Sequence, residues 1–203
     1  MRKRDSTMLE VALVMLIAAT GGSRVPVVGG PCEGCENVFV AMPDDVPAGT
    51  TRIAPEDESG EPMRIVGTVR RADGTPATGV IVYAYHTNAE GVYPEGDTRH
   101  GRLRAWVTTD GDGHYRFDTI RPASYPDTSI PAHVHMHVIE PGRCTYWIDS
   151  IHFADDPLLP EREQTDRGDA RGGFGVVTPE KSDGVWMVRR DIILGKNVPG
   201  YPE

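Results

Sequence analysis

The chain has 203 residues, with 21 Lys and Arg against 30 Asp and Glu, which gives a formal net charge of −9 at pH 7. This length suits one domain with a short appendage, and it is sufficient to bury a hydrophobic core. The acidic balance argues against a nucleic-acid-binding protein, which needs a basic surface. Glycine and proline contribute 23 and 17 residues, nearly a fifth of the chain, without a collagen period. Such a composition predicts many turns between short elements, and therefore a β-rich fold rather than a helical bundle.

The first 21 residues resemble an export signal. Three basic residues at 2–4 precede an apolar stretch at 11–19 that is followed by small residues. The stretch has the length of a signal-peptide core and is short for a membrane-spanning helix. We therefore expect residues 1–21 to be a cleaved signal peptide and the protein to be secreted or periplasmic, without a stable membrane span. An uncleaved anchor and a cytoplasmic location are the alternatives.

Residues 22–62 are predicted to be an irregular arm, because four prolines interrupt any long element after position 36. The arm carries Cys32-Glu-Gly-Cys35, and Cys144 is the third cysteine of the chain. In an oxidising compartment we expect either a Cys32–Cys35 bridge or a bridge from one of these two to Cys144, and one thiol is left over. A redox pair of the thioredoxin type is disfavoured, because the motif does not follow a strand and open a helix.

From residue 63 onward, short β-branched and aromatic runs alternate with strong turn signals, so residues 63–203 are predicted to be a single β-domain. At least seven short strands with turns between them favour an all-β fold, namely an antiparallel β-sandwich with long loops and little helix. The predicted strands span residues 64–70, 79–85, 103–109, 114–117, 133–139, 147–153 and 185–194.

Two segments between the strands invite interpretation. Asp110-Gly-Asp-Gly113 predicts a hairpin turn. It does not fit a calcium loop, because its glycine comes too early and no Glu follows at the twelfth position. The segment 155–173 carries six acidic and three basic residues, so we expect it to be a solvated loop.

The most informative segment is Pro131-Ala-His133-Val-His135-Met-His137. Successive side chains of a β-strand alternate, so the three histidines lie on one face. Imidazoles at positions i and i+2 can converge on one ion, and the proline fixes the start of the strand. Three histidines in this arrangement favour a metal site over unrelated half-buried strand histidines.

Two tyrosines stand in glycine- and proline-rich turns and are candidate partners for these histidines. Tyr93 lies in Glu-Gly-Val-Tyr-Pro, and Tyr125 lies in Arg-Pro-Ala-Ser-Tyr-Pro. A phenolate is a hard anionic donor, so two phenolates with two neutral imidazoles suit ferric iron better than zinc. With one hydroxide the charge of such a centre sums to zero, which permits a partly apolar environment.

The region from about Gly67 to Leu159 resembles the intradiol ring-cleavage dioxygenases, the family of protocatechuate 3,4-dioxygenase and catechol 1,2-dioxygenase. The resemblance implies a prealbumin-like sandwich that holds non-haem Fe(III) and opens the ring of a small aromatic diol with O2, between the two oxygen-bearing carbons, to a muconate-type diacid. It also implies that Tyr125 accepts a substrate proton, and a homo-oligomer is possible. The implied iron ligands are Tyr93, Tyr125, His133 and His135, and the matching stretches read GTVRRADGTPATGVIVYAYHTNAEGVY, TTDGDGHYRFDTIRPASYP, PAHVH and IHFADDPLL.

The chain departs from the family pattern at two positions. Ile130 stands where the family has an arginine before the Pro-Ala-His motif, and Ser150 stands where the family has a glutamine in the following strand. We expect Arg102 or Arg104 to supply the missing positive charge near the reacting oxygens. The sequence leaves open which catechol is the substrate and whether the two departures change the reaction.

Two other classes of protein share part of this pattern. A cupin would use His133, His135 and Glu140 as metal ligands, but the flanking glycines and a second cupin motif are missing. A non-catalytic prealbumin-like or carboxypeptidase-regulatory-like module would explain the turns and Tyr125. It would not explain why Tyr93 and the two histidines accompany them.

Overall fold

The computed structural model describes residues 25–32 and 34–203, so the expected signal peptide at 1–21 lies outside the described residues. Within the described part, no helix is long and apolar enough to span a membrane. The expected all-β class is confirmed. The described helices are the short 3-10 helices η1 (Cys35–Phe39) and η2 (Glu161–Glu163).

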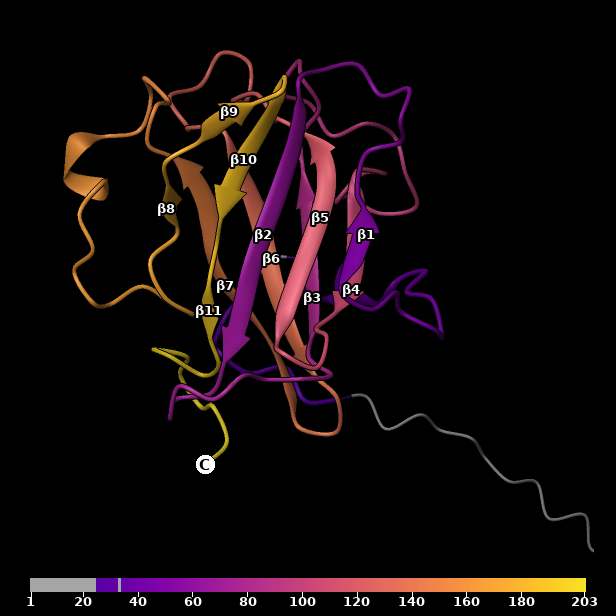
Figure 1. The fold of residues 1–203 in the computed structure, drawn as a ribbon, viewed down its shortest axis with the longest axis vertical. Coiled ribbons are helices and arrows are strands. Elements are labelled where there is room, and N and C mark those ends of the chain that lie inside the picture. Colours follow the sequence, from indigo (N-terminus) through magenta and orange to yellow (C-terminus); the bar gives the residue numbers. More distant parts are fainter. Residues whose placement is uncertain (1–24, 33) are drawn as a thin grey trace, which may run out of the picture.

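Two sheets form a sandwich, with the sheet of β2, β5 and β10 in front of the sheet of β3, β6 and β7 in Figure 1. The first sheet contains, in spatial order, β1 (Thr50–Arg52), β5 (His114–Ile120), β2 (Pro62–Arg70), β10 (Val185–Arg189) and β9 (Glu180–Ser182), and β11 (Ile192–Ile193) also pairs with β2. The second sheet contains β4 (Arg104–Thr108), β3 (Ile81–His86), β6 (His133–Glu140), β7 (Cys144–Phe153) and β8 (Val176–Val177).

The central pairings are antiparallel, as expected, but each sheet also has parallel pairs. β2 pairs antiparallel with β5, and the same holds for β3 with β4 and β6 and for β6 with β7. β1 with β5, β2 with β10 and β11, and β7 with β8 are parallel. Parallel neighbours cannot be joined by a tight hairpin. Here a long loop joins β7 to β8, and the other parallel partners are separated by several intervening strands. The sheets are therefore mixed rather than wholly antiparallel.

The prediction of a hairpin at Asp110–Gly113 was wrong. β4 and β5, which flank it, belong to different sheets, so the turn carries the chain across the sandwich. The local turn itself is tight: Oδ1 of Asp110 accepts hydrogen bonds from the backbone of Asp112 and His114. Thr109, directly after β4, connects this end of the strand to the segment before β3: its Oγ1 donates a hydrogen bond to Ala77 O at 2.6 Å. A turn motif predicts a reversal of direction, but it does not predict which sheet receives the next strand.

The alternation on β6 explains how the histidines avoid the core. Val134, Met136 and Val138 pack between the two sheets, whereas the three histidines lie on the opposite face of the strand. The N-terminal arm covers part of that outer face: Val38 of η1 packs beside Trp106, whose Nε1 donates to Val38 O at 2.8 Å.

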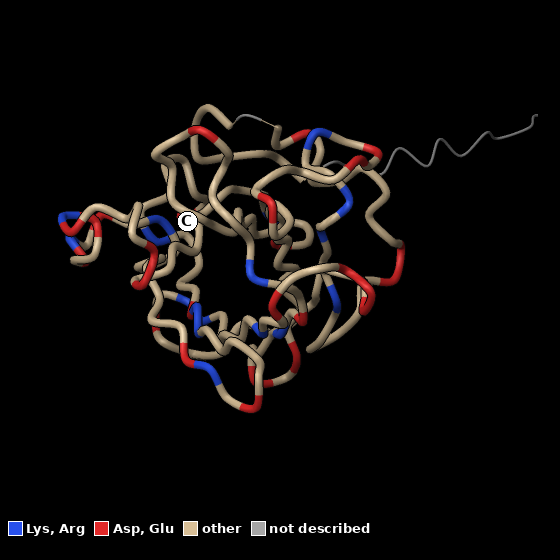
Figure 2. The backbone as a smooth tube through the Cα atoms, turned by 90° about the horizontal axis from the view of Figure 1, so that it is seen from above, with Lys and Arg blue, Asp and Glu red and all other residues tan. Residues whose placement is uncertain are grey.

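A disulfide joins Cys32 to Cys35, which confirms one of the two expected pairings, and Cys144 is free and buried. Acidic residues recur on the peripheral loops all round the described part of the chain (Figure 2), so the acidic surplus does not mark one particular site.

Candidate metal centre

Two tyrosines and two histidines from three separate segments bring their polar atoms to one place. Oη of Tyr93 lies 2.6 Å from Oη of Tyr125, which lies 3.3 Å from Nε2 of His133. Nε2 of His133 lies 3.0 Å from Nε2 of His135. All four residues are half-buried, so the cluster is within reach of solvent. The structure thus brings together the four residues that the sequence suggested as metal ligands; we call them the Tyr2His2 cluster.

The loops that carry the tyrosines approach each other closely at Gly91. Its φ is +78°, and a Cβ atom there would lie 1.9 Å from the carbonyl oxygen of Ser124. Only glycine permits this approach without displacing one of the loops. Hydrogen bonds join the same loops: Thr87 Oγ1 donates to Ala123 O at 2.7 Å, and Ala123 N donates to Asn88 O at 3.1 Å. These contacts keep the two phenol groups adjacent.

A backbone contact sets the tautomer of His133. Its Nδ1 lies 2.7 Å from the carbonyl oxygen of Pro131, which can only accept, so we assign the ring proton to Nδ1. Nε2 then presents a lone pair to the cluster. Burial lowers the pKa of His133, and burial together with the neighbouring imidazoles lowers the pKa of His135 to about 3. Both rings are therefore neutral near pH 7, the form that binds metal ions.

The phenol of Tyr93 is held in its neutral form when no cation is near. Burial raises its pKa, and the hydrogen bond with Tyr125 raises it further. A bound cation reverses this preference, because it stabilises the phenolate by direct electrostatic attraction. The rings themselves are well ordered by packing: His135 stacks on Tyr85 with 4.5 Å between ring centroids.

The third strand histidine, His137, does not join the Tyr2His2 cluster. Its Nε2 lies 3.7 Å from Sγ of Cys32, and burial lowers its pKa to about 3. This agrees with the ligand set that the family resemblance implies, which does not include His137.

His152 lies next to the cluster and was missed by the sequence analysis. It is paired with His133 across β6 and β7, and the two ring centroids are 5.7 Å apart. One signal in the sequence could have found it. His152 stands two residues after Ser150, a position that the resemblance had already assigned to the site, and residues at i and i+2 share a face.

The two arginines expected near the reacting oxygens have other partners. Arg102 forms an ion pair with Glu58. Arg104 lies 3.8 Å from the carboxylate of Asp97 and donates to Val40 O at 3.0 Å. Their catalytic role stays a prediction.

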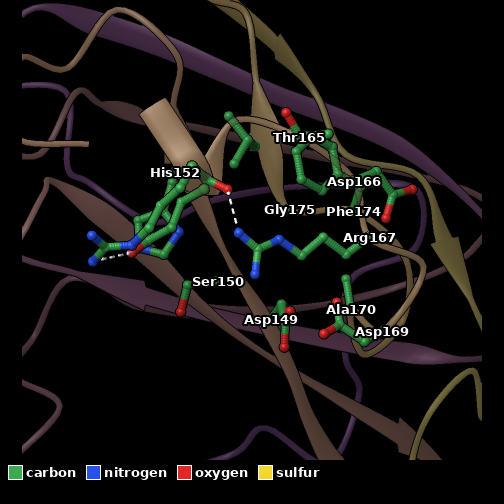
Figure 3. A pocket seen from close by; sticks show the side chains of 13 residues that line it. Asp149, Ser150, His152, Thr165, Asp166, Arg167, Asp169, Ala170, Phe174 and Gly175 are labelled. Carbon is green, nitrogen blue, oxygen red and sulfur yellow. Dashed lines mark hydrogen bonds and ion pairs between the residues drawn. The ribbon is translucent and has the colours of Figure 1, made fainter. Parts of the chain in front are cut away.

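A cavity of about 450 Å³ has His152 in its wall (Figure 3), and the four residues of the cluster do not line it. One wall is the stretch of β7 that carries Ser150 and His152, and the ring of His152 is near that of His133. The charged segment 155–173, expected to be a solvated loop, provides much of the opposite wall. The side chain of Ile130, which stands where the family has an arginine, is not among the lining residues and is 45% exposed. The lining residues are Asp149, Ser150, His152, Arg162, Glu163, Thr165, Asp166, Arg167, Asp169, Ala170, Phe174, Gly175 and Val176.

Comparison with known proteins agrees with this architecture. A family model described as Dioxygenase matches residues 37–168. Catechol 1,2-dioxygenase 1 of Acinetobacter lwoffii is 31% identical over 153 residues, which cover 59% of this chain and 49% of that protein. The protocatechuate 3,4-dioxygenase beta chain of Burkholderia cepacia is 32% identical over 120 residues and 50% of each chain. The chain spans about half the length of these curated relatives.

Solved structures share the fold. Catechol 1,2-dioxygenase from Acinetobacter sp. ADP1 superposes with a TM-score of 0.58 at 25% identity, covering 78% of this chain and 62% of that one. The dioxygenase domain of a carbohydrate-binding protein fusion from Streptomyces sp. SirexAA-E gives a TM-score of 0.57 at 22% identity, covering 75% and 91%. Fold and sequence together define a β-sandwich dioxygenase. The chain belongs to the intradiol ring-cleavage dioxygenase family.

Family membership decides between the classes that the sequence left open. The cupin alternative also lacks its third ligand, because the carboxylate of Glu140 accepts hydrogen bonds from Tyr146 and Tyr201 at 2.9 and 3.1 Å. The matched relatives are named as dioxygenases and not as non-catalytic sandwich modules.

Proposed function

We propose that this protein is a non-haem Fe(III) intradiol dioxygenase, which opens a catechol-type ring with O2 to a muconate-type diacid. The observation that carries the proposal is the convergence of two phenol oxygens and two neutral imidazole nitrogens in the Tyr2His2 cluster. The relatives are named as catechol 1,2-dioxygenase and protocatechuate 3,4-dioxygenase, which supports the reaction class.

The cluster fits a metal ion on its own geometry. Because His133 donates through Nδ1, its Nε2 lone pair faces Nε2 of His135 at only 3.0 Å. Two nitrogens bound at about 2.1 Å along perpendicular directions would stand about 3.0 Å apart. An ion between them would take the place of the hydrogen bond that the two nitrogens can share when one of them carries a proton. The two phenol oxygens are hard donors, which favours ferric iron over softer ions.

When bound, Fe(III) would chelate the deprotonated diol and draw electron density from its ring, which activates the ring toward O2. The residues of the chain bind, orient and move protons. The loop of Tyr93 is held against Ser124 at Gly91, so the phenol oxygen of Tyr93 stays in place as a metal ligand. Oη of Tyr125 contacts both Tyr93 and His133, and it is the atom we assign to accept a substrate proton.

We infer that the diol reaches the cluster from the cavity beside His152. Ser150 leaves room in that wall, and the charged segment 155–173 supplies both carboxylates and guanidinium groups to a substituent on the ring. We also propose a secreted or periplasmic location, which the Cys32–Cys35 disulfide supports because such bonds persist in oxidising compartments.

The test is optical and chemical. Protein loaded with Fe(III) is expected to be red-brown from charge transfer between phenolate and iron, and catechols are expected to drive oxygen uptake with a diacid as product. Tyr125→Phe should shift the band and lower oxygen uptake by roughly 100-fold. Tyr93→Phe should also alter the band. Tyr201→Phe removes a phenol outside the cluster and should leave both readouts unchanged.

Two results would contradict the proposal. Folded protein that stays colourless after iron loading would exclude the ligand set. A coloured protein that consumes no oxygen with any catechol would retain the ligand set but exclude the reaction.

A further inference from the structure

The Cys32–Cys35 disulfide lies against His137, outside the Tyr2His2 cluster. Sγ of Cys32 is 3.7 Å from Nε2 of His137, and the ligand atoms of all three residues lie within 4.8 Å of one another. Cys35 and His137 are 5% and 4% exposed. The proposed dioxygenase chemistry uses none of these three residues, so the arrangement calls for its own explanation.

The imidazole of His137 has few hydrogen-bond partners other than the sulfur of Cys32. Its Nδ1 is buried and lacks a hydrogen-bond partner among the described residues. The contact from its Nε2 to Cys32 is therefore the one hydrogen bond of the ring in the described part of the chain. A buried polar ring that relies on a weak sulfur acceptor is poorly satisfied as the structure stands.

A second buried imidazole is directed at the same place. His100 is 2% exposed, and its Nδ1 lies 2.8 Å from Oη of Tyr83. Its Nε2 is buried and has no partner among residues 25–32 and 34–203. A Cβ atom on Gly34, between the two cysteines, would lie 2.8 Å from this nitrogen. His100 thus points an unused donor or acceptor at the turn that carries both sulfurs.

We propose that Cys32, Cys35 and His137 bind a thiophilic divalent ion, with zinc as the type case, when the disulfide is reduced. His100 lies outside the group of atoms within 4.8 Å of one another, so it would move toward the ion to supply the fourth ligand. C-x2-C is the spacing of many zinc sites, and a Cys2His2 set is a common closed shell. Bond lengths of about 2.3 Å to sulfur and 2.0 Å to nitrogen place those atoms about 3.5 Å apart in a tetrahedron, close to the contact of 3.7 Å between Cys32 and His137. Two thiolates also neutralise a divalent ion, which suits a buried site.

The disulfide and the metal site exclude each other. A dithiol reductant would give two electrons and two protons to the disulfide; the S–S bond breaks, two thiols form, and the reductant becomes a disulfide. Binding of the ion then releases the two thiol protons. The occupancy of the site would therefore depend on the thiol–disulfide poise around the protein.

The test uses Co²⁺ as the probe, because cobalt–thiolate bonds give near-ultraviolet charge-transfer bands that phenol and imidazole ligands do not. The full chain is treated with dithiothreitol under anaerobic conditions, the new thiols are counted, the reductant is removed, and Co²⁺ is titrated. We expect thiolate bands in the reduced protein, none in the oxidised protein, and displacement of cobalt by Zn²⁺.

Variants separate this site from the Tyr2His2 cluster. Cys32→Ser with Cys35→Ser should abolish the bands, and His137→Gln should weaken cobalt binding by at least the roughly 10- to 100-fold that loss of a supporting residue costs. Cys144→Ser removes the remaining thiol and should change nothing. Tyr125→Phe should leave the thiolate bands intact, so failure of the dioxygenase proposal would not affect this result.

Thiolate bands that persist in the double cysteine variant, or that are absent from the reduced wild type, would overturn the proposal. So would a disulfide that dithiothreitol cannot open in the folded chain.

Discussion

Gly91 is a single residue on which the geometry of the Tyr2His2 cluster depends. It combines a left-handed φ of +78° with a carbonyl oxygen 1.9 Å from where a Cβ would be. The two effects have different consequences. A side chain added at this φ would strain only the local backbone. The added Cβ would also collide with the carbonyl oxygen of Ser124 and push the loop of Tyr93 away from the loop of Tyr125.

We predict that Gly91→Ala damages iron binding more than it damages the fold. The Oη–Oη contact of 2.6 Å should be lost, with a weaker charge-transfer band and a stability loss of about 1–3 kcal/mol. Gly74→Ala is the matched control, since Gly74 has φ +86° but nothing within 4 Å of a Cβ. Equal loss of the band in both variants would show that backbone strain, not the loop approach, is responsible.

At the scale of elements, the predicted strand 185–194 is two strands, β10 and β11, and the buried Arg190 lies between them. Its side chain is buried, with 1% exposed. The guanidinium donates to Asp191 O at 2.7 Å and to Gly173 O at 2.9 Å. It also donates to the carbonyl oxygens of Asp149 and of residues 171–172, at 3.3–3.4 Å. The guanidinium therefore connects β7 to the end of the segment that walls the cavity. Burial lowers the pKa of this arginine, yet it remains charged at neutral pH.

Arg190→Met should destabilise the protein by about 2–4 kcal/mol, because the apolar side chain leaves several buried carbonyls without donors. Urea unfolding of the two proteins gives this difference directly. Arg189→Ala is the control: its side chain is 64% exposed and pairs only with Asp191 at 3.1 Å, so its effect should stay within about 0.5 kcal/mol. Equal effects for the two variants would rule out the bonding role of Arg190.

These elements also show what the sequence could predict and what it could not. Alternation on β6 is local, so it was sufficient to place His133 and His135 on one face. The approach of Tyr93 to Tyr125 was suggested by their donor chemistry and by the family resemblance. No local pattern could establish it, because two loops meet there through contacts distant in sequence. His152 was missed because it depends on the register between β6 and β7, which shifts between Val134 and Met136.

For the molecule as a whole, His86 connects the two sheets. It ends β3, and its Nε2 lies 2.7 Å from Oγ1 of Thr119 on β5, while Nδ1 donates to Thr87 O at 2.6 Å. The residue is fully buried, and burial lowers its pKa to about 4, below the ordinary value of 6.5. Both ring nitrogens are hydrogen-bonded, and protonation would place a positive charge inside the sandwich, where burial removes it from water.

The metal-free protein should therefore lose stability as the pH falls from about 6.5 to about 4. In this range the unfolded chain protonates His86 and the folded chain does not, so acid favours unfolding, and the effect is absent above pH 6.5. For this residue it amounts to roughly 3 kcal/mol at pH 4. Urea midpoints measured across this range should fall less steeply in His86→Gln, whatever its stability at pH 7. His114→Gln, at a side chain 57% exposed, should keep the wild-type slope. If His86→Gln keeps it too, the buried imidazole between the sheets is not a source of acid sensitivity.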